Sequence, residues 1–575
     1  MTLRVLVCAW LGLLLVTAHA HAQPRPRGRY EAEALTQALE ALHLEEEPAP
    51  EGKLLDRIWV VNLEVFGPRT GFLRWFNVFH RTTRWRQIER EVILRPGELW
   101  DQGKLQETER KLRDPLFSSQ VVVVPVKSPH PGRVDLLVVT RDVWSMRFNS
   151  RFEIQEQSFT KLTLSISENN LLGARKQLAL VFDMDQSDVF VGPLYVDKNI
   201  AGTRLQLRAY GGPLFSRETG ELEGSQSSTT FQYPLWSLQR TWAAGISVVH
   251  FDGVVRDFIG TDLRTYDDPS SAEVEEVPWR YEQRNVDIET SVTRSFGKEV
   301  LYRVSAGHDL HVQRPAVPDD FAFPEAVRDA FVRDVFPRSE RTSSLFARLN
   351  VFTPRYVAYR DISTYDLSED ARLGPEATVT AGAALEAIGA ETNFLFASAS
   401  SSYTQDLRGD GFARVATAAS MRLQDGELID NRLDLVAKVV TPRIADLLRV
   451  AAQLQVGRRL NEQQNRFFTV GGDDGLRGYR IRAFNGQARV LGNVELRSMP
   501  IAIWFARAGA IAFWDVGHAA ETFSDLGFRH DVGAGIRWLL PQLSPLVYRL
   551  DWAVPLTGSG RGFPGRIIFG VDQVF

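Results

Sequence analysis

Residues 486–499, GQARVLGNVELRSM, decide the fold, because polar and apolar residues alternate along them. Arg489, Asn493, Glu495 and Arg497 fall on one side, and Val490, Val494 and Leu496 fall on the other. A period of two residues belongs to a β-strand whose two faces meet different surroundings. No helical period appears here, so we predict a strand with one polar and one apolar face.

The same alternation recurs across the last four hundred or so residues of the chain. It is clear in RLQLRAY (204–210), RLDLVAKVV (432–440) and YRLDWAVPL (548–556). A soluble antiparallel sheet gives the same pattern, so a β-sandwich and a propeller are alternatives. Repetition without clear helices, with Trp and Tyr near strand ends, favours an all-β transmembrane barrel.

The first residues, MTLRVLVCAWLGLLLVTAHAHAQ, have the order of a secretory signal peptide. A basic residue precedes an apolar run, and small residues in A-x-A spacing follow it. We predict a signal peptide over residues 1–22, with cleavage after Ala20 or Ala22. The single cysteine, Cys8, lies inside this segment. The mature chain is therefore expected to have neither a disulfide nor a thiol site.

The composition excludes several classes of function. With 575 residues and a formal net charge of −4, no strongly basic surface is expected, so nucleic acid is not a predicted partner. No later stretch has about eighteen consecutive apolar residues, so no membrane-spanning helix is predicted. G-x-S-x-G, H-E-x-x-H and Walker motifs are absent, and the ten histidines are scattered. We therefore predict no enzyme activity, no cofactor and no metal site.

Between the signal peptide and the barrel, the pattern changes twice. Residues 23–54 are charged and contain proline, and we interpret them as a solvated linker with a possible short helix. Residues 55–141 then give the order β-α-α-β-β, which predicts one sheet covered by two helices. Asp101 is expected to cap the second of these helices. The barrel is expected to occupy residues 142–575.

Residues 90–126, REVILRPGELWDQGKLQETERKLRDPLFSSQVVVVPV, resemble a POTRA (polypeptide-transport-associated) domain. In the barrel, SENNLLGARKQLAL (167–180), GGDDGLRGY (471–479), FWDVGHA (513–519) and the terminal VDQVF (571–575) are similar to motifs of the BamA/TamA family of outer-membrane assembly and translocation proteins, also described as the bacterial surface antigen type. The resemblance implies a barrel of about sixteen antiparallel strands in the bacterial outer membrane. It places one small α+β POTRA-like domain in the periplasm.

The glycine-rich segment 467–482, FFTVGGDDGLRGYRIR, interrupts the alternating strands. A phosphate loop would be followed by a helix, whereas alternation follows here. The resemblance implies that the loop folds into the barrel lumen and that Arg477 meets Asp515. The loop motif comprises Gly471, Gly472, Gly475, Leu476, Arg477, Gly478 and Tyr479, and the partner motif comprises Phe513, Asp515 and Gly517. A surface loop with a solvated arginine is the alternative.

The resemblance also implies a function, which is the insertion or translocation of polypeptide clients at the outer membrane. An edge strand at Ser119–Val126 would receive the client by β-augmentation. The client would then reach a seam between a first strand, about Lys161–Glu168, and the last strand, Gly565–Phe575, where Phe575 is the terminal barrel signal at an aromatic girdle. Predicted partners are the outer-membrane lipid bilayer, polypeptide clients, and periplasmic chaperones or accessory assembly proteins. A two-partner-secretion export pore and a passive channel are the alternatives.

Overall fold

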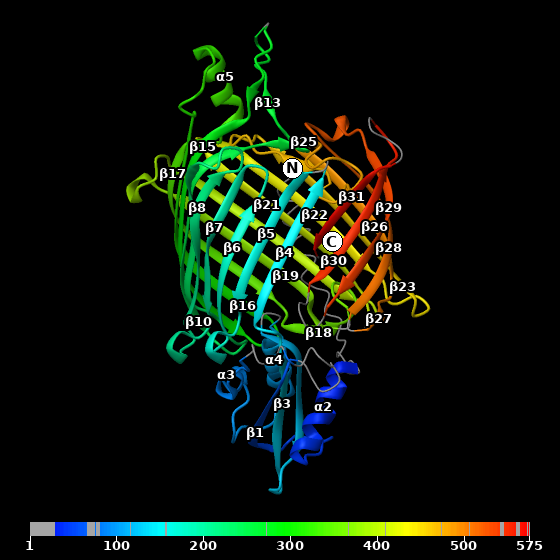
Figure 1. The fold of residues 1–575 in the computed structure, drawn as a ribbon. Helices are drawn as coiled ribbons and strands as arrows, with labels where there is room; N and C mark the ends of the chain where they lie inside the picture. The colour runs from blue at the N-terminus through cyan, green and yellow to red at the C-terminus, as the bar shows by residue number, and fades with distance from the viewer. Residues whose placement is uncertain are drawn as a thin grey trace.

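The computed structural model shows a small N-terminal domain attached to one end of a closed barrel (Figure 1). It describes residues 29–65, 75, 81–114, 117–155, 158–271, 273–365, 367–408, 410–472, 474–504, 506–540, 546–558, 564–571, 573 and 575. The predicted signal peptide, residues 1–22 with Cys8, lies outside the described residues. In the part of the chain that the structure describes, no helix is long and apolar enough to cross a bilayer.

The small domain is built on a three-stranded sheet with the order β1-β3-β2. Its elements are β1 (Leu54–Leu63), α3 (Trp85–Glu91), α4 (Gln102–Leu112), β2 (Ser118–Lys127) and β3 (Arg133–Asp142). β1 pairs with β3 in parallel and β2 pairs with β3 antiparallel. Both helices pack their apolar residues, Ile88 and Leu105 among them, against one face of the sheet. The Asp101 carboxylate caps α4 by accepting a hydrogen bond from the Lys104 backbone N–H at 3.0 Å.

A further helix, α2 (Arg29–Leu42), covers the opposite face of this sheet. Ala34, Leu35 and Ala38 are buried against Val122 and Leu137 of the sheet. The interpretation of residues 23–54 as a solvated linker is therefore wrong for this helix. Many of its residues are charged or polar, and its apolar stripe at i, i+1 and i+4 is narrow. Such a stripe is nevertheless enough to dock one helix.

Among the described residues, the barrel has twenty wall strands in a closed ring, and consecutive wall strands from β4 to β31 pair antiparallel. These strands are β4 (Met146–Gln155), β5 (Ser158–Glu168), β6 (Lys176–Met184), β7 (Asp188–Asp197), β8 (Gln206–Ser216), β9 (Leu222–Tyr233), β10 (Trp242–Arg256), β15 (Arg280–Gly297), β16 (Leu301–Ala316), β17 (Glu340–Phe352), β19 (Glu369–Ala384), β20 (Phe394–Asp406), β21 (Phe412–Gln424), β22 (Glu427–Val440), β23 (Leu448–Leu460), β26 (Ala488–Ser498), β28 (Ala506–Ala520), β29 (Arg529–Leu539), β30 (Val547–Pro555) and β31 (Arg566–Val571). The predicted architecture, a small α+β domain followed by an all-β barrel, is confirmed.

The expected number of about sixteen strands is corrected to twenty. Some neighbouring strands are joined by connections too short to interrupt the alternating pattern. β21 and β22 are separated by only Asp425 and Gly426, which adopt the positive φ angles of a tight hairpin turn. Alternation across such a turn reads as one long strand, so the sequence hides the boundary.

We call the end of the barrel next to the small domain proximal and the other end distal. Short elements occupy both ends: β18 (Arg355–Tyr359), β27 (Ile501–Ile503), η3 (Leu171–Gly173) and η4 (Ile200–Gly202) are proximal, and β11 (Phe258–Ile259), β12 (Asp262–Leu263), β13 (Thr265–Tyr266), β14 (Val277–Pro278), α5 (Glu325–Val335), η5 (Glu386–Ile388), β24 (Phe468–Val470), β25 (Phe484–Gly486) and η6 (Phe523–Asp525) are distal. Figure 1 shows α5 and β13 projecting beyond the distal rim.

The two faces of the wall differ in the way that the alternation predicts. Large apolar side chains such as Trp514 and Ile567 are 44% and 66% exposed on the outer face. Their sequence neighbours Asp515 and Ile568 point inward and are buried. The outer face is therefore apolar, and the interior holds the charged groups.

The ring closes between β31 and β4. The predicted first strand, about Lys161–Glu168, lies in β5 and is the second wall strand, so that prediction is wrong. The stretch MRFNSRFEIQ of β4 also alternates and precedes it, and the sequence between the two strands leaves no break in the pattern. At the closing junction the rings of Phe152 and Phe569 stack with their centroids 4.2 Å apart.

Candidate functional site

The glycine-rich segment 471–479 lies inside the barrel, against the inner face of β26, β28 and β29. A tight turn forms where the Leu476 N–H donates to the Gly471 carbonyl at 2.9 Å, and Gly475 adopts a φ of 111°. Gly478 approaches the wall so closely that a Cβ atom there would lie 2.5 Å from Cβ of Asp531. Only glycine fits this contact, and the Gly478 N–H donates to the Asp531 carboxylate at 2.9 Å.

Arg477 is fully buried and lies within ion-pair distance of carboxylates on three wall strands, β26, β28 and β30. Its Nε and Nη2 donate to the two carboxylate oxygens of Asp515 on β28 at 2.7 and 2.8 Å. Its Nη1 donates to Glu495 on β26 at 2.7 Å. The structure therefore brings together the two residues that the resemblance paired, and the bidentate geometry fixes the orientation of the loop.

The remaining residues of the two motifs frame this ion pair. The Phe513 ring lies under the guanidinium, 3.4 Å from ring centroid to Cζ. Leu476 and Tyr479 pack in a buried cluster on the loop, and the Tyr479 hydroxyl donates to the Thr557 carbonyl at 2.7 Å. A Cβ atom on Gly517 would lie 2.9 Å from Leu491, so this glycine leaves room for the Leu491 side chain, which belongs to the same buried cluster. The Gly472 N–H donates to the Arg480 carbonyl at 3.1 Å.

Arg477 belongs to a larger charged cluster that the sequence motifs do not reveal. The cluster contains the cations Arg477, Arg497, Arg537 and Arg549 and the carboxylates Glu495, Asp515, Asp531 and Asp551. Arg497 contacts Glu495 at 2.7 Å, and Arg537 contacts Asp551 at 2.5 Å. The four guanidinium groups pair directly with Glu495, Asp515 and Asp551, which offsets the large cost of desolvating each charge, whereas Asp531 accepts a hydrogen bond from the Gly478 N–H. The sequence does indicate that most of these residues face inward, because they lie on the polar face of a predicted strand.

The terminal Phe575 does not lie at an outer aromatic girdle, so that prediction is wrong. It packs against an inward cluster that includes Tyr359, Leu373 and Val440. Arg497 donates from Nη2 to the Phe575 carbonyl at 3.0 Å. β31 ends at Val571, so the strand alternation no longer dictates which way Phe575 points.

The small domain docks directly on the proximal turns of the barrel. On one side, Asn170 of the SENNLLG motif donates from Nδ2 to the Arg81 carbonyl at 2.8 Å. A Cβ atom on Gly173 would lie 2.8 Å from the Thr82 carbonyl, so the motif glycine permits this approach. On the other side, Arg113 of α4 contacts Asp370 of β19 at 2.8 Å. The motif is therefore the docking turn between domain and barrel.

Further ionic contacts support the docking. Glu91 of α3 pairs with Arg204 of the β7–β8 turn at 2.6 Å and with Lys111 of α4 at 2.8 Å. Burial raises the pKa of Glu91, but the attraction of Lys111 and Arg204 outweighs it and holds the pKa below the ordinary 4.5. Glu31 of α2 pairs with Arg360, just beyond β18.

The predicted receiving edge, Ser119–Val126, is partly occupied. The Glu47 N–H donates to the Pro125 carbonyl at 3.0 Å, and the Lys127 N–H donates to the Glu45 carbonyl at 2.9 Å. Pro125 itself has no N–H to offer a client. The edge that remains for β-augmentation is therefore the earlier part of β2, before Pro125.

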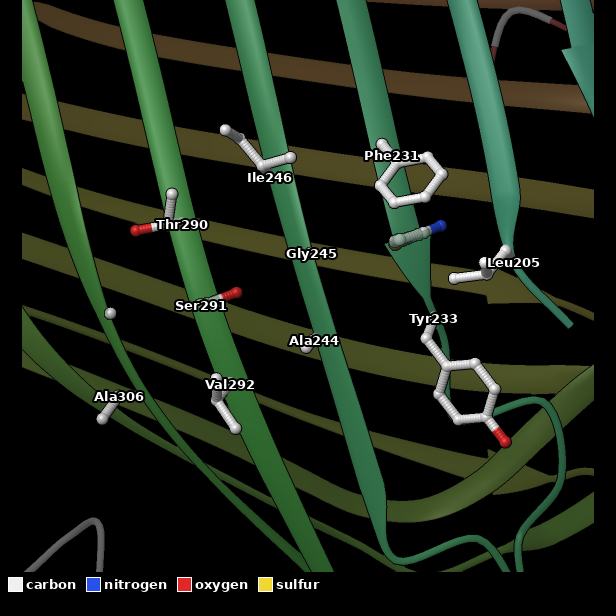
Figure 2. Close-up of a pocket in the computed structure, with 12 residues that line it drawn as sticks. Leu205, Phe231, Tyr233, Ala244, Gly245, Ile246, Thr290, Ser291, Val292 and Ala306 are labelled. Atoms are coloured by element: carbon white, nitrogen blue, oxygen red, sulfur yellow. The ribbon is translucent and has the colours of Figure 1, made fainter.

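Among the described residues, no group of three or more His, Cys, Asp or Glu side chains is arranged to hold a metal ion. An apolar depression of 520 Å³ lies on the outer face between β9, β10 and β15 (Figure 2). Phe231, Tyr233, Ile246 and Val292 line it together with small residues, and all four are substantially exposed. It contains no titratable carboxylate, histidine or amine, so it offers a surface for apolar groups rather than for catalysis.

No family model and no curated protein matches the chain. Among solved structures, BamA from Haemophilus ducreyi lacking POTRA domains 1–3 is 12% identical, with a TM-score of 0.35 over 97% of this chain and 96% of that one. CdiB from Acinetobacter baumannii is 11% identical, with a TM-score of 0.40 over 91% of this chain and 74% of the other. CdiB from Escherichia coli is 11% identical, with a TM-score of 0.43 over 97% and 93%. Similarities of this size assign neither a family nor a function to this chain.

Proposed function

We propose that this chain is an outer-membrane barrel that inserts or translocates polypeptide clients, and that it has no enzyme activity. The observation that carries the proposal is the buried Arg477 cluster. It ties an inward loop to β26, β28 and β30, next to the closing strand β31. An open conduit for small solutes has no need of a loop held at such electrostatic cost.

The apolar outer face supports the membrane location. Exposed leucine, valine, phenylalanine and tryptophan side chains follow the outer positions of successive strands. In water such a continuous surface would drive association, whereas in a bilayer it meets lipid. Under this proposal the proximal end and the small domain lie in the periplasm, and the distal loops face the exterior.

The closing junction supports lateral release of a client. β31 has six residues, fewer than any other wall strand, and it pairs with β30 over those six positions. Gly570 leaves space that the Arg549 guanidinium occupies, since a Cβ atom at this glycine would lie 2.7 Å from Nε of Arg549. A short junction has few hydrogen bonds to break, and a client strand would satisfy the backbone groups that opening exposes. The client's own pairing and burial would then supply the free energy.

A cross-link across the junction tests this proposal. Phe152→Cys and Phe569→Cys replace two rings that stack on each other, so we expect a disulfide to form. In the source bacterium, oxidation should lower the amounts of client proteins in the outer membrane and medium, as measured by mass spectrometry, and reduction should restore them. The matched control pair, Trp552→Cys and Ile567→Cys, bridges β30 and β31 at facing positions and should leave those amounts unchanged.

If the Phe152–Phe569 cross-link forms fully and client amounts stay constant, lateral opening is excluded. Export through the lumen, as in two-partner secretion, then becomes the better explanation. If no protein changes in abundance when the gene is deleted, the chain has no polypeptide clients and the proposal fails.

A further inference from the structure

The proximal rim of the lumen carries an arc of cations that the proposed function has not used. We define the cationic arc as Arg303 on β16, Arg372 on β19, Arg414 on β21 and Lys438 on β22. Each lies within four residues of the proximal end of its strand. Their neighbours Val304, Val415 and Val439 are exposed on the outer face, so alternation directs the arc inward.

The arc is not neutralised by direct ion pairs as other buried arginines of the barrel are. No carboxylate among the described residues lies within ion-pair distance of Arg303, Arg414 or Lys438. Only Arg372 has an acidic partner, Glu376. By contrast, Arg449 pairs with Asp410 at 2.8 Å, and Arg477, Arg497 and Arg537 all have carboxylate partners. Three of the four cations in the arc therefore lack the direct carboxylate partner that these other arginines have.

The positions within the arc make this arrangement costly. Arg414 and Lys438 face each other directly across the β21–β22 pair, where like charges repel. The Nε of Arg303 is buried and has no hydrogen-bond partner. Arg303 and Arg372 both lie near one ring, with their Cζ atoms 4.7 and 4.8 Å from the Phe352 centroid. An anionic ligand would relieve the repulsion and satisfy the donor, so the cost points to a binding site.

The arc is continuous with the small domain. Tyr356 of β18 pairs with Arg372, and Arg110 of α4 lies 3.7 Å from the centroid of the Tyr356 ring. Arg110 thus begins a cationic track that continues through Arg372 to Arg414, whose side chain is exposed to the lumen. A track of this length suits an extended chain with several carboxylates better than a single small anion.

We infer that the cationic arc binds an acidic, Asp- or Glu-rich segment of a polypeptide client as it passes from the small domain into the lumen. This inference rests on the proposed function, which it deepens by naming the chemistry of the client. The arc provides electrostatic attraction without a fixed sequence requirement. Arg303 and Arg414 contact the carboxylates, and the repulsion between Arg414 and Lys438 is relieved when the segment lies between them.

Binding of a labelled deca-glutamate peptide to the full-length protein in detergent micelles tests this inference by fluorescence anisotropy. We expect binding at low salt that weakens steeply as salt is raised, and no binding of a neutral Gly-Ser peptide. The double variant Arg414→Gln with Lys438→Gln should weaken binding by about tenfold or more. The charge-conserving variant Arg414→Lys with Lys438→Arg should keep it.

The matched control removes two other lumenal cations, Arg432→Gln with Arg489→Gln, which share the carboxylate of Asp434. It should change the affinity less than about threefold. Equal weakening by the control, or no binding by the unmodified protein, overturns the inference. If the double variant fails to fold, as seen from its migration on unheated gels, the single Arg303→Gln variant provides the test.

Competition by free glutamate, at the same total carboxylate concentration as the peptide, distinguishes a polypeptide ligand from a small anion. Poor competition supports a polypeptide ligand, and full competition replaces it with a small-anion site. Peptide binding is measured on purified protein, so it stands if the proposed function fails in cells. Conversely, the client amounts in cells can respond to the cross-link while the purified protein binds no peptide. That result overturns only the inference about the cationic arc.

Discussion

At the scale of single residues, Arg477 stabilises the barrel because it is the shared cation of two buried carboxylates. Replacing it with alanine leaves Asp515 and Glu495 without their shared cation in a site that excludes water. We expect Arg477→Ala to destabilise the folded barrel by about 3–5 kcal/mol. Thermal unfolding of the purified protein in detergent measures this loss.

The double variant Arg477→Ala with Asp515→Ala serves as the control for that measurement. It removes both charges, so it should be less destabilised than the sum of the two single variants. Arg477→Lys should behave closer to Arg477→Ala than to the native residue, because an ammonium cannot span two carboxylates with a planar fork. Strict additivity of the two single changes would mean that the observed pair contributes no coupling energy.

Gly478 gives a second prediction at this scale, based on space rather than charge. A methyl group there would overlap Cβ of Asp531 at 2.5 Å, so Gly478→Ala should cost about 1–3 kcal/mol of stability. Gly527→Ala is the matched control, because nothing lies within 4 Å of its Cβ position. Equal unfolding temperatures for the two variants would contradict the close approach of the loop to the wall.

At the scale of elements, helix α2 changes what counts as the small domain. It buries Ala34, Leu35 and Ala38 on a sheet face that would otherwise meet water. A fragment over residues 29–142 should therefore fold as a soluble unit and melt at a higher temperature than a fragment over residues 55–142. Circular dichroism checks both the fold and the melting temperature.

Ala38→Arg in the longer fragment provides the control, because it places a charge against this sheet face. Its melting temperature should fall to that of the shorter fragment. If the two fragments have the same melting temperature and Ala38→Arg does not change it, α2 contributes nothing to the stability of the domain.

The elements also show how far the sequence leads. Alternation predicts the wall strands well, because a barrel wall imposes the two-residue period on every strand. The first of the two predicted helices is short in the structure, where α3 ends at Glu91 and Trp85 is 55% exposed. Pro96 and Gly97 then form a turn, in which Gly97 adopts a φ of 86°.

The buried cluster was only half predictable, for a physical reason. Alternation puts Glu495 and Asp551 on inward faces, but it cannot say which strands are neighbours across the interior. The Arg477–Asp515 pair came from a resemblance between motifs and not from spacing. Phe575 was misplaced because the face of a residue beyond the last paired position is set by tertiary packing alone.

At the scale of the whole molecule, the docking of the small domain should depend on pH. Since Lys111 and Arg204 hold the pKa of Glu91 below 4.5, its ionisation stabilises the docked state above that pH. The contribution is lost as the pH falls through the lowered pKa, so acid should release the domain. Labels attached through Ser128→Cys and Lys298→Cys report the separation by energy transfer.

Glu91→Gln is the control for this measurement. Its docking should be weaker at neutral pH, and it should vary less with pH than docking in the native chain. The same separation at neutral and acidic pH in the native chain would show that Glu91 does not govern docking.

The contact between Glu31 and Arg360 has a consequence for the timing of biogenesis. The two residues are 329 positions apart, and ten wall strands lie between them along the chain. Contacts at such separation form late, after the intervening segments have found their places. Helix α2 precedes every wall strand in the sequence, yet its contact with Arg360 needs the strands from β4 to β17 to be in place. The docked position of α2 thus reports that assembly of the barrel has advanced to its midpoint.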